Sequence, residues 1–186
     1  MEKENEFKLM LVENEYNYLM SIFRSIVVKS GLQTNYYYDT MDGLLRKENV
    51  TVRVRQTADK LEGTVKRHLS AMGDSTEDHF PVSKVPQAIM LDHYPVWIRG
   101  ALHTRRTVFR VCEGITMMLD KNTYLDVIDY ELEVEFSLPY RKQAEGVVQL
   151  VLSLLHRARV IQPVSKSERF FRRMDELHTR AKKAKK

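Results

Sequence analysis

Residues 1–8 read Met1-Glu2-Lys3-Glu4-Asn5-Glu6-Phe7-Lys8, and charged residues stand at every second position from Glu4 to Lys8. Glu4, Glu6 and Lys8 are two residues apart, so a strand would place all three on one face. Carboxylates on such a face can hold a hard divalent cation, and a neighbouring lysine can bind a phosphate oxygen. For a single strand, a solvated outer face remains the simpler interpretation.

The same alternation recurs in four further segments, and this recurrence favours a different interpretation. The charged residues of these segments are Arg53 and Arg55, then Glu62 and Lys66, then Arg106, then Glu131, Glu133 and Glu135. Apolar residues occupy many of the alternate positions, as Val52 and Val54 do beside Arg53. A sheet closed with its charged face inward and helices outside explains this segregation. Because a charged interior is costly unless ligands occupy it, we expect the interior to be a binding site.

Periodicity and turn residues predict an α+β arrangement. We expect strands near 2–12, 34–40, 50–56, 61–68, 103–112, 115–120 and 124–136. We expect helices over 13–29 and 87–93, from residue 139 onward, and after the capping box formed by Ser165 and Glu168. The polar stretch 69–86, with Gly73, Pro81 and Pro86, is interpreted mostly as loop.

Length and composition predict one domain over residues 1–178, followed by a basic tail over 179–186. A chain of 186 residues with 43% hydrophobic content can build a substantial core. The longest apolar runs are too short to span a bilayer, and no signal peptide opens the chain, so no membrane partner is expected. Cys112 is the single cysteine, which fits a reducing cytoplasm; we expect it to be a small buried strand residue.

The net charge of +5 is concentrated at the C-terminus. Without the five basic residues of 180–186, the chain has 25 basic and 25 acidic residues. The tail is interpreted as a solvated helix end rather than a polyanion contact, because no aromatic residue is interleaved with the lysines. A nucleic-acid partner is therefore not expected. Zinc-like histidine spacing, a Gly-rich phosphate loop and a Gly-x-Ser-x-Gly motif are all absent from the sequence.

The charged motifs together resemble a known family. They are Glu4-x-Glu6-x-Lys8, Tyr37-Tyr38-Asp39-Thr40, Arg53-x-Arg55, Glu62-x-Thr64-x-Lys66, Arg106, Asp120, Glu131-x-Glu133-x-Glu135 and Ser165-Lys166. In this order they are similar to the CYTH domain of the triphosphate tunnel metalloenzymes, most closely the short single-domain bacterial triphosphatases. The resemblance runs over residues 2–169. It implies a closed or nearly closed eight-stranded antiparallel β-barrel, a tunnel, with helices packed on the outside.

The resemblance also implies roles for individual residues. The catalytic set would be Glu4, Glu6, Lys8, Glu131, Glu133 and Glu135. The substrate-binding set would be Lys8, Arg53, Arg55, Lys66, Arg106, Lys166 and Arg169. The ligands of Mg²⁺ or Mn²⁺ would be Glu4, Glu6, Glu62, Asp120, Glu133 and Glu135. Lys166 would lie in the first turn of its helix, where backbone N–H groups favour anions.

The function expected from these residues is metal-dependent hydrolysis of a small-molecule triphosphate, either inorganic triphosphate or a small organic one. An adenylate cyclase of the same superfamily is one alternative; it needs a base-recognition pocket, and the sequence does not identify one. A non-catalytic polyphosphate- or nucleotide-binding module is another, although it would not need so many acidic residues. We expect a monomer or homodimer.

Overall fold

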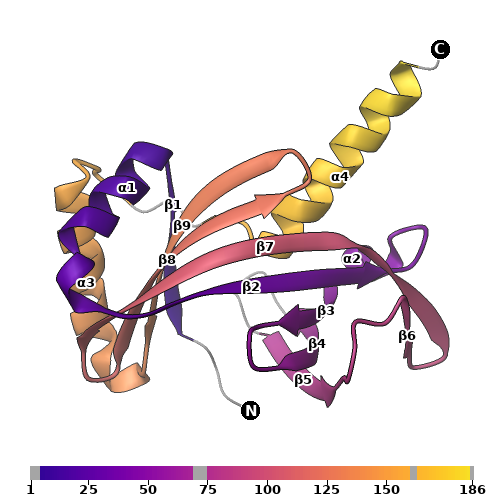
Figure 1. Ribbon diagram of the computed structural model, residues 1–186, viewed down its shortest axis with the longest axis horizontal. Helices are drawn as coiled ribbons and strands as arrows, with labels where there is room; N and C mark the ends of the chain where they lie inside the picture. Colours follow the sequence, from indigo (N-terminus) through magenta and orange to yellow (C-terminus); the bar gives the residue numbers. More distant parts are fainter. Residues whose placement is uncertain (1–4, 69–74, 160–162, 185–186) are drawn as a thin grey trace. The chain divides into compact units, whose positions relative to one another are not determined.

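The computed structural model describes residues 5–68, 75–159 and 163–184 (Figure 1). Its strands are β1 Glu6–Leu11, β2 Val27–Asp39, β3 Val50–Gln56, β4 Leu61–His68, β5 Ser75–Pro81, β6 Ala88–Leu91, β7 Tyr94–Cys112, β8 Ile115–Tyr124 and β9 Val127–Phe136. Its α-helices are α1 Glu13–Ile22, α2 Leu44–Lys47, α3 Arg141–Leu154 and α4 Lys166–Lys183. Short 3-10 turns lie at Arg24–Ile26 and Leu138–Tyr140. The predicted α+β class is confirmed.

The strands form one antiparallel sheet in the order β1-β9-β8-β7-β2-β3-β4-β5, with β6 paired to β7. The expected eight-stranded closed barrel is corrected in two respects. The sheet has nine strands, and among the described residues no backbone pairing joins β5 to β1 to close it. The β5 edge carries Glu77, Asp78 and Pro81, residue types that discourage further strand pairing.

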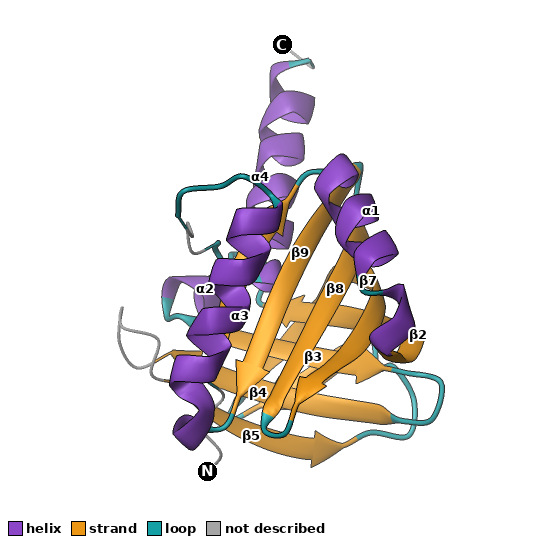
Figure 2. Cartoon of the chain, turned by 90° about the vertical axis from the view of Figure 1, so that its left-hand side faces the viewer, coloured by secondary structure: helices purple, strands orange, loops and turns teal. Residues whose placement is uncertain are grey.

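The chain divides into two compact units, and β2 and β7 contribute residues to both. We call residues 2–32 and 104–164 the acidic unit, and residues 33–103 and 165–186 the basic unit. In the acidic unit, α1 and α3 cover one face of β8 and β9 (Figure 2). The core beneath them includes Leu19 of α1, Val151 of α3, and Leu132 and Val134 of β9. The alternate residues of β1 and β9 are therefore directed to the opposite face of these strands.

The basic unit has its own core, formed by β2, β3, β4, β6 and the first part of β7. Val52 and Val54 of β3 are fully buried in it, beside Val65 of β4 and Val96 of β7. The aromatic rings of Phe170 and Phe171 attach α4 to Tyr37 of β2, with ring centroids 5.2 and 5.8 Å from the Tyr37 centroid.

Three predicted elements are wrong. The helix expected over 13–29 ends at Ile22, and β2 begins at Val27. The stretch interpreted as loop contains β5, which tolerates polar residues because it is an edge strand. The helix expected over 87–93 is instead β6, which pairs with β7 through a turn in which Asp92 has a left-handed φ of 52°.

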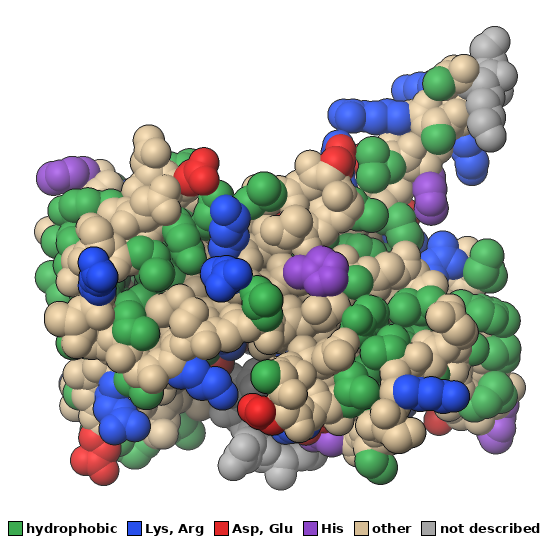
Figure 3. Space-filling model, viewed as in Figure 1, with side chains coloured by type: hydrophobic (Ala, Val, Ile, Leu, Met, Phe, Trp, Pro, Cys, Tyr) green, Lys and Arg blue, Asp and Glu red, His purple; other side chains and the backbone are tan. Residues whose placement is uncertain are grey.

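The C-terminal helix begins as predicted, since the Ser165 hydroxyl accepts a hydrogen bond from the Glu168 backbone N–H at 3.2 Å. It continues to Lys183, so residues 179–183 of the predicted tail are helical. Lys and Arg side chains lie on this outer part of α4 (Figure 3). Cys112 ends β7 and is exposed, which corrects the expectation that it is buried. None of the described helices is both long and apolar enough to span a membrane.

Candidate active site

The acidic unit brings charged residues together through strand register. In the antiparallel pair of β1 and β9, Glu6 lies opposite Glu135 and Lys8 lies opposite Glu133. On the next strand, Asp120 of β8 lies opposite Glu131 of β9. Two-residue spacing on each strand and pairing between strands thus collect these side chains on one face.

Three carboxylates of this face are close enough to share one cation. An oxygen of each of Glu6, Glu133 and Glu135 lies within 4.8 Å of the others. Carboxylate oxygens are the ligands that Mg²⁺ and Mn²⁺ prefer, so the donor set fits a hard divalent cation. The Lys8 ammonium lies 2.7 Å from a Glu6 oxygen and offers positive charge beside the group.

Arg106 of β7 connects the deeper carboxylates. Its guanidinium donates to both oxygens of the fully buried Asp120, at 2.8 and 2.7 Å, and also to Glu133. Burial alone disfavours the charged guanidinium, but the hydrogen bond and charge of Asp120, with the charges of Glu133 and Glu135, raise the pKa of Arg106 above its ordinary value. Asp120 therefore orients Arg106, and the metal-ligand role expected for Asp120 stays a prediction.

The remaining expected acidic residues are placed differently. Glu131 is buried on β9 opposite Asp120. Glu62 lies on β4 of the basic unit, where its carboxylate is 3.1 Å from the Lys60 ammonium. Glu4 lies outside the described residues. The roles of these three residues stay predictions.

The basic unit holds five of the seven expected substrate-binding residues, and the other two, Lys8 and Arg106, lie in the acidic unit. Arg53 and Arg55 lie on one face of β3, and register places Lys66 of β4 opposite Thr51 on that face. The Arg55 guanidinium donates to the Asn35 side-chain oxygen at 3.0 Å, which fixes its direction. The first turns of α4 contribute Lys166 and Arg169.

The buried Tyr37 hydroxyl feels the positive charges of four of these cations. Burial raises the pKa of the Tyr37 hydroxyl, and the positive charges of Arg53, Lys166, Arg55 and Arg169 partly offset that rise. All four cations are therefore close enough to act on one buried phenol. The sequence analysis gave Tyr37 no role of its own, and its membership of the Tyr37-Tyr38-Asp39-Thr40 motif was the available signal.

Glu77 is a charged residue that the sequence analysis missed. It lies on β5 opposite Lys66, and its carboxylate is 2.7 Å from the Lys66 ammonium. Burial opposes its ionisation, but the hydrogen bond and charge of Lys66, with the charges of Arg53 and His79, lower the pKa of Glu77 below its ordinary value. The sequence pattern did not reveal Glu77, because the polar stretch around it is typical of a loop.

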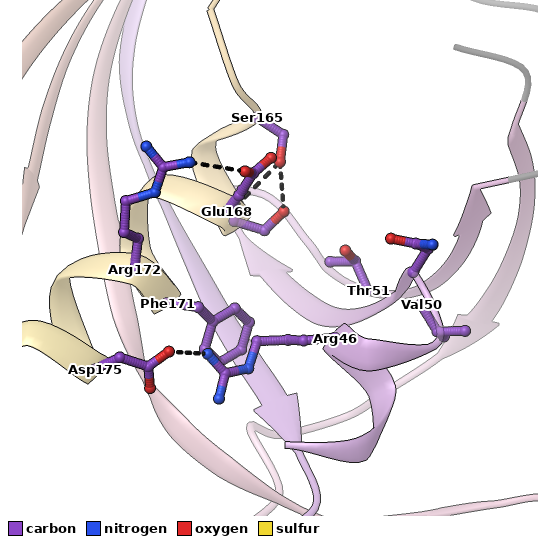
Figure 4. A pocket seen from close by; sticks show the side chains of 10 residues that line it. Arg46, Val50, Thr51, Ser165, Glu168, Phe171, Arg172 and Asp175 are labelled. Carbon is purple, nitrogen blue, oxygen red and sulfur yellow. Dashed lines mark hydrogen bonds and ion pairs between the residues drawn. The ribbon is translucent and has the colours of Figure 1, made fainter. Parts of the chain in front are cut away.

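Arg46 was also missed, and it ties α4 to the rest of the basic unit (Figure 4). Its guanidinium donates to the buried Asp39 at 3.1 Å and to Asp175 of α4 at 2.7 Å. Its Cζ atom lies 4.7 Å from the centroid of the Phe171 ring. This contact, with the aromatic packing on Tyr37, holds the helix that carries Lys166 and Arg169.

Comparison with known proteins places this arrangement in a family. The CYTH domain matches residues 2–171. The chain is 27% identical over 148 residues to the Bacillus subtilis (strain 168) protein named "Putative triphosphatase YjbK", covering 72% of this chain and 77% of that protein.

Solved structures show the same fold. A crystal structure of a "putative adenylate cyclase" from Bacillus halodurans has a TM-score of 0.70 at 23% identity, over 91% of this chain and 98% of that one. HpAC1 from Hippeastrum, described as a "putative adenylyl cyclase" with a dominant triphosphatase activity, has a TM-score of 0.72 at 20% identity, over 90% and 95% of the two chains. With the family match spanning nearly its whole length, this chain belongs to the CYTH domain family.

Proposed function

We propose that this chain hydrolyses the triphosphate group of inorganic triphosphate or of a small organic triphosphate, with Mg²⁺ or Mn²⁺ as its cofactor. The observation that carries the proposal is the group formed by Glu6, Glu133 and Glu135, whose oxygens lie within 4.8 Å of one another beside Lys8 and Arg106. The name of the B. subtilis relative and the triphosphatase activity described for HpAC1 support it.

We assign the cation to the carboxylates of the acidic unit and the phosphates to the cations of the basic unit. A bound cation supplies positive charge for phosphate oxygens, and the three carboxylates would hold it. Lys8 and Arg106 place further positive charge beside them. Glu131, two residues before Glu133 on the same face of β9, would supply a carboxylate that can orient the attacking water.

The basic set binds the phosphates. Arg53 and Arg55 can each make paired hydrogen bonds to phosphate oxygens, whereas Lys66 and Lys166 act as point charges. Together with Arg169 they match the several negative charges of a triphosphate. Catalysis then depends on positioning and charge stabilisation, as is general for phosphoryl transfer.

A substrate panel tests the proposal. Purified protein is incubated with inorganic triphosphate, ATP or pyrophosphate, in Mg²⁺, Mn²⁺ or a chelator, and phosphate and cyclic AMP are measured. We expect metal-dependent phosphate release from triphosphates and little from pyrophosphate, whose shorter chain engages fewer of the cations. Cyclic AMP as the main product from ATP would identify a cyclase. Tight binding of triphosphate without any product would identify a binding module.

A matched pair of variants tests the metal ligands. Glu133→Gln should lower kcat on the order of a thousandfold, since several kcal/mol of transition-state stabilisation depend on the cation. Glu113→Gln, in an exposed turn of the same unit, should keep the parent's kcat. Mg²⁺ should also raise the melting temperature of the parent and of Glu113→Gln. The rise should be much smaller for Glu133→Gln, because that variant lacks one of the three ligands. Parent activity in Glu133→Gln at limiting Mg²⁺ would refute the assignment.

A further inference from the structure

The hairpin formed by β6 and the start of β7 packs one of its two faces against the rest of the basic unit. Leu91 of β6 and Val96 of β7 are buried in the core of that unit. Successive side chains of a strand alternate between its faces, so Ala88 and Met90 of β6 lie on the opposite face of the hairpin. Hydrophobic side chains gather over β6 and the start of β7 in Figure 3.

We call the opposite face the hairpin patch, and it consists of Ala88, Met90, Pro95 and Trp97. Backbone register pairs Ala88 with Trp97 and Met90 with Pro95. Met90 exposes 67% of its surface, and Trp97, the single tryptophan of the chain, exposes 40%. Large apolar side chains that adjoin one another in water often mark an interaction site, and tryptophan and methionine are enriched where two proteins meet. The hairpin patch therefore has the composition of the centre of a protein–protein interface.

Charges of opposite sign lie at the two ends of the hairpin patch. Arg99 follows Trp97 by two residues, so both side chains lie on the same face of β7. The Arg99 guanidinium lies 3.2 Å from the sulfur of Met41, a weak acceptor, and has no carboxylate partner in the part of the chain that the structure describes. At the other end, Asp92 lies in the turn between β6 and β7. Its side chain is 66% exposed, and its carboxylate is 3.9 Å from the Arg67 guanidinium.

This order of charges makes the hairpin patch complementary to itself. Residues 92 and 99 are separated by about 20 Å of extended chain, and the midpoint between them falls next to Pro95, which pairs with Met90. Rotation by 180° about that midpoint places Arg99 of one copy beside Asp92 of the partner subunit, and the reverse pair forms at the other end. The apolar side chains of both copies then meet in the middle. An anionic membrane surface would instead be repelled by the Asp92 carboxylate.

We infer that the hairpin patch binds a second copy of this chain and forms a two-fold symmetric dimer. Met90, Pro95 and Trp97 form the apolar centre of the interface, and the two pairs of Arg99 with Asp92 of the partner subunit orient the copies. Four side chains offer less surface than an obligate dimer buries, so the dimer dissociates on dilution. The inference uses none of the carboxylates or cations that carry the proposed function, and either one can fail without the other.

Sedimentation equilibrium and the fluorescence of Trp97 test the dimer. The parent should sediment as a dimer at high concentration, and dilution should shift its emission to longer wavelength, because the indole ring returns to water as the copies separate. Met90→Glu should weaken association at least about tenfold, since it places a carboxylate in the apolar centre. Leu150→Glu, at an apolar position of α3 that is 55% exposed, is the matched control and should keep the parent's association constant.

A charge exchange tests the orientation of the two copies. Arg99→Glu and Asp92→Arg should each weaken self-association about tenfold or more, because like charges then meet at both ends of the interface. An equimolar mixture of the two variants should associate as tightly as the parent, since each end of the mixed dimer again joins opposite charges.

Asp92→Asn suits the left-handed turn and replaces Asp92→Arg if that variant fails to fold; it should also weaken self-association. A parent that is monomeric at every concentration would overturn the inference. So would a dimer that Met90→Glu leaves unchanged, or a mixture of the charge variants that associates no more tightly than either variant alone.

Discussion

Arg106 is the residue on which the charge balance of the acidic unit depends. Its guanidinium binds both oxygens of Asp120, a side chain with no exposed surface, and also reaches Glu133. The neighbouring Arg105 alternates to the other side of β7 and is exposed. Two adjacent arginines therefore have opposite environments, which makes them a matched pair for mutation.

Arg106→Ala should destabilise the protein by about 3–5 kcal/mol, because it leaves buried carboxylates without their counter-charge. Arg105→Ala should change the free energy of unfolding by less than about 0.5 kcal/mol, as is usual for exposed substitutions. Urea unfolding at pH 7 measures both values. Equal stability of the two variants would contradict the role assigned to Arg106.

Glu77 makes a contribution to stability that depends on pH. Its pKa is lowered in the folded protein, chiefly by Lys66, so its ion pair stabilises the fold above the pKa of an unfolded glutamate, about 4.3. This contribution is lost as the pH falls through the lower folded pKa. Glu77→Gln should therefore be less stable than the parent at pH 7 and pH 5, and the difference should disappear towards pH 3.

Urea unfolding at the three pH values measures this difference. Glu113→Gln is the control, because that exposed side chain should show no such trend. A stability difference for Glu77→Gln that stayed constant down to pH 3 would show that ionisation of Glu77 is not its source.

At the scale of elements, two glycines have opposite environments. A Cβ atom at Gly100 of β7, where φ is 152°, would lie 2.7 Å from the Phe170 ring that holds α4. A Cβ atom at Gly146, on the exposed side of α3, would meet nothing within 4 Å. The first glycine permits close packing, whereas the second only weakens a helix.

Gly100→Ala should therefore destabilise the protein by about 1–3 kcal/mol through overpacking and should weaken triphosphate binding, since α4 carries Lys166 and Arg169. Gly146→Ala should stabilise it by about 0.5–1 kcal/mol through helix propensity and leave binding unchanged. Thermal unfolding with and without inorganic triphosphate measures both effects. A Gly100→Ala protein with the parent's melting temperature and affinity would refute the packing argument.

At the scale of the whole molecule, the net positive charge resides at one end of the chain. Deleting residues 180–186 removes five basic residues and leaves 25 of each sign. The described part of this segment is exposed helix, beyond the aromatic residues that pack α4. The deletion should leave affinity for triphosphate and the ligand-induced rise in melting temperature unchanged. Isothermal titration of both proteins with inorganic triphosphate checks this prediction. A lower affinity of the deletion variant would show that the tail contributes to substrate binding.

Which residues share a face could be predicted from the sequence alone. Alternation in β1, β3, β4 and β9 is a local property, because successive side chains of any strand are directed to opposite sides. Glu6 and Lys8, Arg53 and Arg55, and the β9 carboxylates were therefore predictable as charged faces without knowing their partners. The start of α4 at Ser165 was predictable for a similar reason, since a capping interaction spans only three residues.

Contacts between distant parts of the chain set the register of these strands and explain where the fold departs from local signals. Register places Glu6 opposite Glu135, and Arg106 reaches Asp120 and Glu133 across neighbouring strands. Strand β5 and its Glu77 escaped prediction because an edge strand needs neither apolar residues nor strict alternation. These features depend on contacts between residues far apart in the chain, such as the pairing of Glu6 with Glu135, and a local pattern does not name the partner strand.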